Sequence, residues 1–269
     1  MAKKASSASI RRAEISELVH EKGFVRIDDL ADRFNVTPMT IHRDLDALNT
    51  RGIVSKVRSG ATANSIEEIE RNVNFRAHHM IEQKQSIAAA AAEWLASQPA
   101  LSVIALDDST TALAMADHIA PKSDYTLVTN FLGAIDRVEK EENHDAGAKL
   151  IAIGGTYAPS YRSFNGLAAV EAIRAVQIDV FFLSASSVQG DAVYTAGETA
   201  LMTKRAFMDQ SVQTVLLLDH TKFERRALHR QARFDELDLV VVDEGITPEH
   251  LRDLRRVTRN VLVAPLLSN

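Results

Sequence analysis

Short apolar runs alternate with amphipathic stretches from Leu101 to the end of this chain, and no other feature constrains its fold as strongly. The runs have the length and composition of buried strands, and the stretches between them have the spacing of helices that pack on one face. Alternating strands and helices build a mostly parallel sheet covered by helices. The predicted strands are Leu101–Leu106, Tyr125–Val128, Leu150–Ile153, Val180–Leu183, Val215–Leu218, Leu239–Val242 and Val261–Val263.

Helices are predicted between these strands and ahead of the first one. The Ala88–Ala92 run in the leading helix allows close packing, and Pro99 marks its exit. The leading helix belongs to a predicted linker and connecting segment over residues 64–100, and an α/β effector-binding domain follows over residues 101–269. The helical patterns are Met80–Ser97, Thr111–Ile119, Phe131–Glu142, Leu167–Val176, Ala200–Gln210 and Pro248–Val257.

Polar and small residues follow five of the predicted strands directly. Ligands of open parallel sheets bind beyond the carboxyl ends of the strands, so these residues are expected to surround one small-molecule site. Taken singly, each segment is also typical of ordinary helix caps and turns. Their convergence at one sheet edge favours the site. The segments are Asp107–Thr111; Thr129–Asn130; Gly154–Gly155 with Ser163, Asn165 and Gly166; Ser184–Ser187; and Asp219–Lys222.

The first of these segments opens a predicted helix with hydroxyl side chains. A helix N-terminus offers unpaired N–H groups and a positive dipole end, which suit an anion. A phosphate is therefore expected against Ser109, Thr110 and Thr111, with a lysine supplying charge and Asp or Asn side chains accepting sugar hydroxyls.

Three helical patterns followed by a short ribbon predict a separate DNA-binding unit over residues 1–63. Ser9–Lys22 is the first helix and Ile27–Phe34 the second. A tight turn then leads to Thr37, a good N-cap, and to Pro38, which suits the first position of a third helix. Two helices joined by a tight turn are the helix-turn-helix arrangement, whose second helix enters the DNA major groove.

The third helix carries an apolar stripe and a polar face. Ile41, Leu45 and Leu48 recur at the spacing of one helix face and are predicted to pack inward. Arg43 lies opposite this stripe and near the helix N-terminus, as direct recognition of a guanine edge requires. We expect contacts to double-stranded operator DNA from Thr37, Met39, Thr40, His42 and Arg43.

Gly52–Gly60 alternates the apolar residues Ile53 and Val57 with polar neighbours between two glycines, which predicts a small β-ribbon, or wing. A wing lies beside the DNA backbone when the third helix occupies the groove. Lys56 and Arg58 on this ribbon are therefore expected to contact phosphates.

Charge separates the two regions of the chain. Residues 1–63 carry 11 Lys and Arg against 8 Asp and Glu, a net charge of +3, whereas residues 64–269 carry 20 against 28, a net charge of −8. Positive charge confined to one small face favours specific DNA binding over non-specific coating of nucleic acid.

The chain has no cysteine, which excludes disulfides and thiolate metal sites, and it shows no signal peptide or membrane span. We expect a cytoplasmic protein without a membrane partner.

The run from Arg11 to Ala61 resembles the winged N-terminal domain of the DeoR family of bacterial transcriptional regulators. In that family the third helix carries the pattern Ser-x-x-Thr-Ile-Arg-Arg-Asp-Leu, and the basic wing ends His-Gly-Gly-Ala. His42 stands here where an Arg is usual, and Arg58–Ser59 where His-Gly is usual, which bears on operator sequence and affinity rather than on DNA binding itself. The matching positions are Thr37, Thr40, Ile41, Arg43, Asp44, Leu45, Gly60 and Ala61.

The later part of the chain resembles the C-terminal effector domain of the same family, which is similar in fold to ribose-5-phosphate isomerase. The resemblance implies a repressor whose ligand is a phosphorylated sugar or a related metabolite, with Lys204 as a further contact. Ser109 stands where the family has Gly, and Asp108 adds negative charge beside it, so an unphosphorylated effector is an alternative. The matching positions are Asp107, Thr110, Thr111, Thr129, Asn130, Gly154, Gly155, Gly166, Lys204, Asp219, Lys222 and Phe223.

Two other function classes are open from the sequence. A sugar-phosphate isomerase with a DNA-binding head needs carboxylates after a strand, and Ser184–Ser187 supplies none, while Glu198 and Lys204 are more typical of a ligand clamp or a salt bridge. A C-terminal domain that serves only for assembly would leave the polar strand ends without a purpose. We therefore predict no catalytic residues, no cofactor and, because the nine histidines lack ligand spacing, no metal site. A homo-oligomer, either dimer or tetramer, is expected because one short winged domain makes too few contacts for a specific operator.

Overall fold

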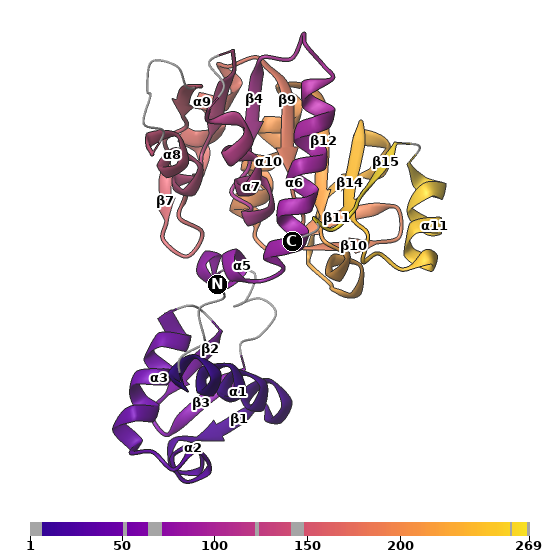
Figure 1. Cartoon of the computed structure of the whole chain (residues 1–269). Coiled ribbons are helices and arrows are strands. Elements are labelled where there is room, and N and C mark those ends of the chain that lie inside the picture. Colours follow the sequence, from indigo (N-terminus) through magenta and orange to yellow (C-terminus); the bar gives the residue numbers. More distant parts are fainter. Residues whose placement is uncertain are drawn as a thin grey trace. The chain divides into compact units, whose positions relative to one another are not determined.

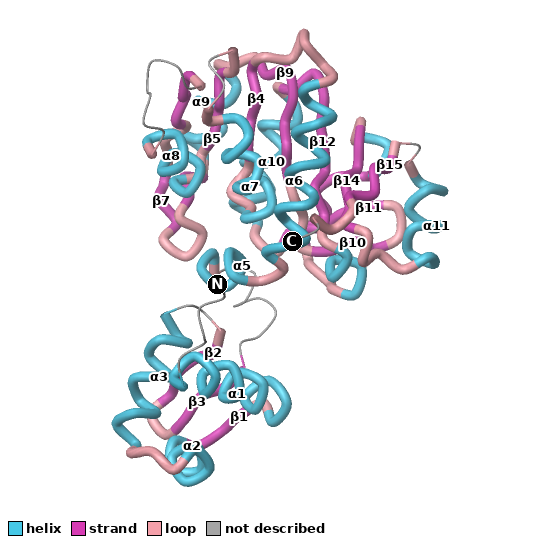
Figure 2. The backbone as a smooth tube through the Cα atoms, in the orientation of Figure 1, coloured by secondary structure: helices cyan, strands magenta, loops and turns pink. Residues whose placement is uncertain are grey.

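The computed structural model describes residues 7–50, 53–63, 72–121, 124–140, 148–258 and 260–267. Its contacts divide the chain into two compact units, Met1–His79 and Met80–Asn269. Figure 1 shows the elements of each unit, and Figure 2 shows helices and strands along the backbone. No helix within the described ranges combines the length and the apolar character that crossing a membrane requires.

The first unit contains the three predicted helices and an antiparallel sheet (Figure 1). β2 and β3 form the wing hairpin, and β1, a strand that the sequence did not indicate, extends it in the order β1-β3-β2. Gly52, the predicted start of the ribbon, lies outside the described residues. The elements are α1 Ser7–Lys22, β1 Phe24–Arg26, α2 Ile27–Phe34, α3 Pro38–Thr50, β2 Val54–Val57, β3 Gly60–Ala63 and α5 Val73–His78.

The wing packs differently from the predicted alternation. Val54 is the buried residue of β2, whereas Ile53 precedes the strand half-buried and Val57 is exposed. Gly60 starts β3 opposite β1, where a Cβ atom would lie 2.0 Å from the Val25 carbonyl oxygen. Glycine at this position is therefore what allows the third strand to pair.

α3 is fixed at its start and along its inner face. The Thr40 amide donates to the Thr37 hydroxyl at 3.3 Å, which confirms Thr37 as the N-cap. Ile41, Leu45 and Leu48 are buried as predicted, in the apolar core that α3 shares with α1 and α2.

Asp44, also on α3, is a buried carboxylate that two arginines of α1 neutralise. Its oxygens accept hydrogen bonds from Arg11 Nε at 2.6 Å and from Arg12 Nε at 2.8 Å. A buried carboxylate needs such partners because desolvation disfavours its charge. The two ion pairs therefore fix how α3 lies on α1, and with it the direction of the outer face of α3.

The second unit is built on a parallel sheet in which the neighbouring strands are β15-β14-β12-β9-β4-β5-β6. All seven predicted strands are confirmed, with ends shifted by a few residues, and every pair is parallel. The strands are β4 Val103–Leu106, β5 Thr126–Thr129, β6 Lys149–Ala152, β9 Ile178–Leu183, β12 Ser211–Leu218, β14 Leu239–Asp243 and β15 Val261–Ala264.

Helices cover both faces of this sheet (Figures 1 and 2). β9 shows the division: Phe182 makes an edge contact with Trp94 of α6 at 6.2 Å between ring centroids, while Phe181 stacks on Phe207 of α10 at 5.0 Å. Successive side chains of a strand face opposite sides, so α6 and α10 lie on opposite faces. α6, predicted within the connecting segment, belongs to the second unit. The helices are α6 Ile81–Ala96, α7 Thr110–Ile119, α8 Leu132–Glu139, α9 Leu167–Arg174, α10 Glu198–Asp209 and α11 Pro248–Val257.

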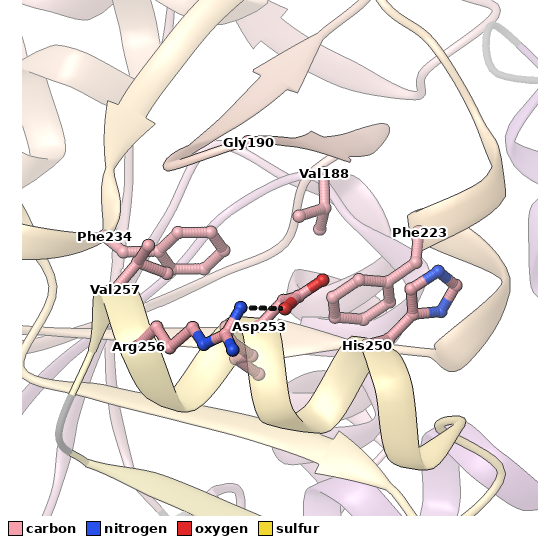
Figure 3. Close-up of a pocket in the computed structure, with 9 residues that line it drawn as sticks. Val188, Gly190, Phe223, Phe234, His250, Asp253, Arg256 and Val257 are labelled. Atoms are coloured by element: carbon pink, nitrogen blue, oxygen red, sulfur yellow. Dashed lines mark hydrogen bonds and ion pairs between the residues drawn. The ribbon is translucent and has the colours of Figure 1, made fainter.

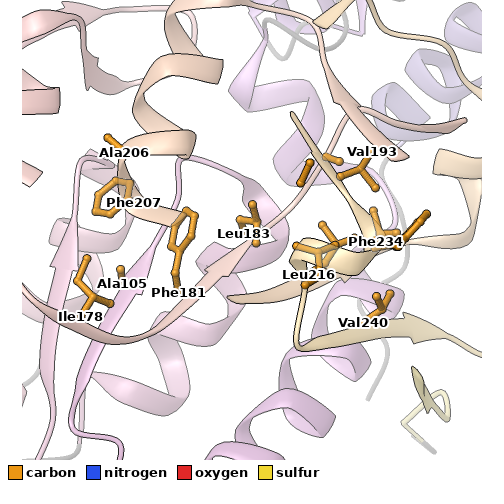
Figure 4. Close-up of a cluster of buried hydrophobic side chains, with 14 of the residues drawn as sticks. Ala105, Ile178, Phe181, Leu183, Val193, Ala206, Phe207, Leu216, Phe234 and Val240 are labelled. Carbon is orange, nitrogen blue, oxygen red and sulfur yellow. The ribbon is translucent and has the colours of Figure 1, made fainter. Parts of the chain in front are cut away.

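The apolar core on the α10 face joins the large sheet to a smaller one (Figure 4). It includes Phe181 and Phe207, continues through Leu216 of β12, and reaches Val193 and Phe234 beyond the large sheet. Burial of these side chains removes a large apolar area from water, which is the main force that holds the sheets together.

Two smaller antiparallel pairings were not indicated by the sequence. β10-β11-β13 form one sheet and β7-β8 form a hairpin. These strands are only three to five residues long, too short to show a clear periodicity. The bounds are β7 Thr156–Ala158, β8 Ser163–Asn165, β10 Ser187–Gln189, β11 Ala192–Thr195 and β13 His229–Arg233, with 3-10 helices η1 His220–Glu224 and η2 Phe234–Glu236.

Replacing Asp44 by Ala is expected to lower the free energy of unfolding by about 1 to 3 kcal/mol, because Arg11 and Arg12 lose the carboxylate that neutralises them. Chemical denaturation of the full chain, with the transition of the first unit followed, measures this loss. Asp46→Ala is the matched control on the same helix, since its ion pair with Lys56 is largely exposed and is expected to contribute less than about 1 kcal/mol. Equal losses in the two variants would contradict the anchoring role of Asp44.

Candidate effector site and nucleic-acid interface

The carboxyl ends of β12, β9, β4 and β5 meet at one edge of the large sheet, because these strands are neighbours that run in the same direction. Most of the residues predicted to bind the effector follow these strands or come from the β7-β8 hairpin and α10. Their side chains are buried in the second unit. The buried residues are Asp107, Ser109, Thr110, Thr111, Thr129, Asn130, Asn165, Lys204, Asp219 and Lys222.

Asp107 and Lys204 form the centre of the polar cluster. The Lys204 ammonium donates to the Asp107 carboxylate and, at 3.1 Å, to the Ser184 carbonyl oxygen. The same carboxylate accepts the Ser184 amide at 2.9 Å and the Ser109 amide at 3.0 Å. Asp107 therefore ties the ends of β4 and β9 to α10, and its charge is neutralised by Lys204.

Asp108 is the second buried carboxylate at the end of β4. Ser163 Oγ donates to Asp108 Oδ2 at 2.7 Å, and Asn165 Nδ2 donates to Ser163 Oγ at 2.9 Å. Lys204 Nζ lies 3.9 Å from Asp108 Oδ1, farther than from Asp107. The β7-β8 hairpin thus brings hydroxyl and amide groups against a carboxylate that the lysine neutralises less completely.

Asn130 and Thr129 occupy the end of β5 in different ways. The Thr129 hydroxyl donates to the Leu106 carbonyl oxygen at 2.9 Å and accepts the Phe131 amide at 3.1 Å, so the backbone engages it on both sides. Asn130 Nδ2 donates to the Phe164 carbonyl oxygen at 2.8 Å. Asn130 Oδ1 is buried and accepts no hydrogen bond from any residue that the structure describes. Of these two side chains, Asn130 is the one with a buried acceptor that no described residue satisfies.

α7 begins at the polar cluster and receives a lysine from α6. Ser109 is its N-cap, with its hydroxyl accepting the Ala112 amide at 3.0 Å and its φ of −86° in the ordinary extended region. The Ser109 side chain thus lies along the start of the helix. Lys84 Nζ donates to Thr110 Oγ1 at 3.0 Å, and Lys84 is 7% exposed. Lys84 was not predicted from the sequence, because the helix pattern indicated core packing. The signal that could have identified it is a lysine among apolar helix neighbours.

Asp219 and Lys222 lie at the end of β12. Burial alone would raise the pKa of Asp219, but the Lys222 charge, the Thr221 hydroxyl and the Lys84 charge together lower that pKa below its usual value. Asp219 is therefore ionised at neutral pH. Lys84 thus bonds Thr110 at the start of α7, and its charge also acts on Asp219 at the end of β12.

Asp243 positions the short helix η1 that carries Lys222. Its buried carboxylate accepts the His220 amide at 2.7 Å, the His220 ring Nδ1 at 2.7 Å and the Gly245 amide at 3.0 Å. Asp243 was not predicted from the sequence, since nothing in its local pattern distinguishes it from a strand-end turn residue. It holds η1 against the end of β14.

Two of the three predicted glycines, Gly155 and Gly166, have structural roles beside the site. Gly155 packs against β8, where a Cβ atom would lie 2.7 Å from the Asn165 carbonyl oxygen. Gly166 precedes α9 with a φ of +87°, a conformation that side chains rarely adopt. Gly154 is exposed, and a Cβ atom there would meet nothing.

A separate hollow of about 360 Å³ lies between α11, η1 and the β10-β11 turn (Figure 3). The Phe223 and His250 rings stack on one side of it, with centroids 5.1 Å apart. Phe223, which matched a family marker, thus faces this mainly apolar hollow and not the polar cluster. The hollow is lined by Val188, Gly190, Phe223, Phe234, His250, Asp253, Leu254, Arg256 and Val257.

The predicted DNA-binding side chains lie on the outer side of α3 and on the wing. Arg43 is exposed and forms no ion pair with a described residue, and Met39 is 62% exposed. His42 is half-buried on the flank. Arg58 is exposed in the turn of the wing, whereas Lys56 Nζ pairs with Asp46 on α3 at 2.5 Å. A phosphate contact by Lys56 therefore competes with this ion pair.

The two parts of the chain match two family models. A DeoR-like helix-turn-helix domain matches residues 11–67, and a DeoR C terminal sensor domain matches residues 79–244. The HTH-type transcriptional regulator YgbI of Escherichia coli (strain K12) is 35% identical over 94% of this chain and 97% of its own length. The lactose phosphotransferase system repressor of Staphylococcus aureus (strain NCTC 8325 / PS 47) is 28% identical over 87% of this chain and 91% of its own length.

Among solved structures, ribose 5-phosphate isomerase from Plasmodium falciparum matches 52% of this chain and 53% of its own, with a TM-score of 0.35 and 12% identity. The regulator relatives match nearly the whole chain, and the two family models follow one another in the order of its DNA-binding and sensor parts. The chain therefore belongs to the DeoR family of transcriptional regulators.

Proposed function

We propose that this protein is a cytoplasmic repressor of carbohydrate-metabolism genes, released from double-stranded operator DNA by a phosphorylated sugar or a related metabolite. The observation that carries DNA binding is the exposed Arg43 on α3, opposite a stripe that is buried in the core. Membership of a regulator family supports the class. Repression of carbohydrate genes is supported by the resemblance to a lactose phosphotransferase system repressor.

A phosphorylated effector is supported by the cations and hydroxyls at the edge of the large sheet. Lys84, Lys204 and Lys222 are all buried there, although lysine is rarely buried in proteins. Lys84 reaches Thr110 at the N-terminus of α7, where helix dipole and hydroxyl groups also favour an anion. These lysines and hydroxyl groups together can bind the phosphate group of a sugar phosphate.

An unphosphorylated effector is the second candidate, and Asp108 is the observation that favours it. This carboxylate is buried within the same cluster and would repel a phosphate placed directly beside it. An isomerase is not retained, because the chain belongs to a family of regulators and Ser184–Ser187 supplies no carboxylate for proton transfer.

We also propose that the regulator acts as a dimer or tetramer. A single winged unit presents few base contacts, and pairing two units on a two-fold site raises both affinity and specificity. The expected contacts from each unit are Thr37, Met39, Thr40, His42, Arg43, Lys56 and Arg58.

Arg43→Ala is expected to weaken operator binding by about 1 to 3 kcal/mol and to relax the preference at one base position, because a bidentate contact to a guanine edge is lost. Competition binding with single-base operator variants measures both effects. Arg58→Ala is the matched control: loss of a phosphate contact should weaken all sequences alike and reduce the salt dependence. If Arg43→Ala also weakened every sequence equally, its role in base recognition would be wrong.

Operator release is expected from one phosphorylated sugar and not from its unphosphorylated parent, in a mobility-shift assay with the DNA beside the protein's own gene. Lys84→Met should raise the concentration for half-maximal release about tenfold or more, because a charge-assisted hydrogen bond to phosphate is lost. Lys149→Met, exposed on β6, is the control and should leave release unchanged.

Each other outcome of this assay has a defined meaning. Release by an unphosphorylated compound alone would favour an unphosphorylated effector. Asp108 and Ser109 would then account for the preference against phosphate. Absence of any sequence-specific DNA binding would contradict the proposal that the protein is a transcriptional repressor.

A further inference from the structure

The hollow between α11, η1 and the β10-β11 turn has a mainly apolar lining (Figure 3). Phe223, Phe234 and Leu254 contribute apolar side chains to it. Two charged side chains, Asp253 and Arg256, also border the hollow, but they pair with each other at 3.1 Å, so their charges cancel. Its volume of about 360 Å³ lies at the lower end of the range that binding pockets span. An uncharged apolar group therefore suits the hollow.

Leu228 lies beside the hollow and is 79% exposed, more than any other large apolar side chain that the structure describes. Gln189 Nε2 donates to the Ala227 carbonyl oxygen at 3.3 Å, which fixes the residue before Leu228. Val188 and Gly190, on either side of Gln189, line the hollow. Single exposed leucines are common on protein surfaces. Leu228 differs because an apolar hollow lies next to it on the same chain.

The charges around these two features are complementary. Two exposed arginines, Arg226 and Arg230, flank the leucine. On α11, Glu249, Asp253 and Arg256 follow the spacing of one helix stripe along the border of the hollow. Two carboxylates and one guanidinium give this stripe a net charge of −1. A segment that presents an apolar side chain between two arginines therefore matches the hollow in both polarity and charge.

A second copy of the chain supplies such a segment. In a two-fold interface the same surface is used on both chains, so a residue that contacts a partner site receives the same contact in return. Leu228 of each chain can then occupy the hollow of the other, and both apolar surfaces leave water together. This arrangement closes on itself, whereas the same contact made head to tail would leave one leucine and one hollow exposed at the ends.

We propose that two copies of this chain pair about a two-fold axis, with Leu228 of each copy bound in the hollow beside α11 of the other. The proposal rests on the homo-oligomer of the proposed function and names the surface that forms it. Leu228 is the central anchor of the interface, and the arginines beside it contact the α11 stripe at the border. Phe223 lines the hollow and the adjacent Lys222 is buried at the end of β12, so the pairing surface and the candidate effector site share η1.

Single cysteines can report this contact, because the chain has none of its own. Leu228→Cys chains and Val188→Cys chains, one of them carrying a tag that changes its mass, are mixed and treated with a short bismaleimide. The cross-linked heterodimer is expected to be about tenfold or more above the level from Val212→Cys mixed with Val188→Cys, because pairing raises the local thiol concentration. Val212 is the matched control, since it is apolar, 67% exposed and on β12.

Leu228→Asp is expected to raise the dissociation constant of the pair by about a hundredfold, because each pair loses two apolar anchors and places two carboxylates against apolar linings. Sedimentation equilibrium of the full chain measures this constant. Leu228→Met, which keeps an apolar side chain, should pair like the wild-type protein, and Val212→Asp should leave pairing unchanged. Circular dichroism of Leu228→Asp should match the wild type, because the side chain is exposed in the single chain.

The outcomes separate this inference from the proposed function. A wild-type protein that is monomeric at micromolar concentration would contradict both the homo-oligomer and the pairing surface. A wild-type oligomer that Leu228→Asp leaves intact, or that gives no excess cross-link from position 228 to position 188, would overturn the pairing surface while the homo-oligomer stands. Loss of one pairing step in Leu228→Asp alone, from dimer to monomer or from tetramer to dimer, together with the excess cross-link, supports the inference.

Discussion

Every strand of the large sheet runs in the same direction, and the polar chemistry of the second unit depends on that constraint. Residues that follow β4, β5, β9 and β12 are distant in sequence and meet at one edge. Their charges are buried, so each needs an opposite charge or a hydrogen-bond partner inside the protein. Asp107 meets this need with Lys204 and two backbone amides, and Asp219 meets it with its neighbouring lysines.

The same requirement organises α3 in the first unit. Asp44 is buried on α3 and is neutralised by Arg11 and Arg12 of α1, so the helix is held by charge as well as by its apolar stripe. One side of α3 is thereby committed to the core, and Arg43 is left on the outer side. In both units, a buried carboxylate fixes a helix: Asp44 holds α3, and Asp107 holds α10 at the strand ends.

The strands and helices of the second unit were predictable from the sequence wherever the apolar pattern was strong. Val215–Leu218 and Leu239–Val242 are buried on both faces, as strands of a parallel sheet covered by helices are, whereas β6 at the sheet edge is largely exposed. β10 and β8 escaped prediction because strands of three residues show no period. The strand ends that form the candidate site were predictable, but the contacts between their side chains were not. Lys84 comes from a helix whose pattern indicated only core packing. The pairing of Lys204 with Asp107 depends on the fold, which no local pattern specifies.

Ligand binding changes operator affinity only if the ligand binds two arrangements of the chain with different affinity. α6 is where such a difference can arise, because it is the first helix of the second unit and also carries Lys84 to Thr110. Met80 opens this helix with a left-handed φ of 56°, which a non-glycine residue adopts at a cost, and its carbonyl accepts the Lys84 amide at 3.0 Å. In the proposed function, a phosphate bound by Lys84 lies one helical turn from Met80, the first residue of the second unit. Linkage is reciprocal, so operator DNA must weaken ligand binding by the factor with which the ligand weakens operator binding.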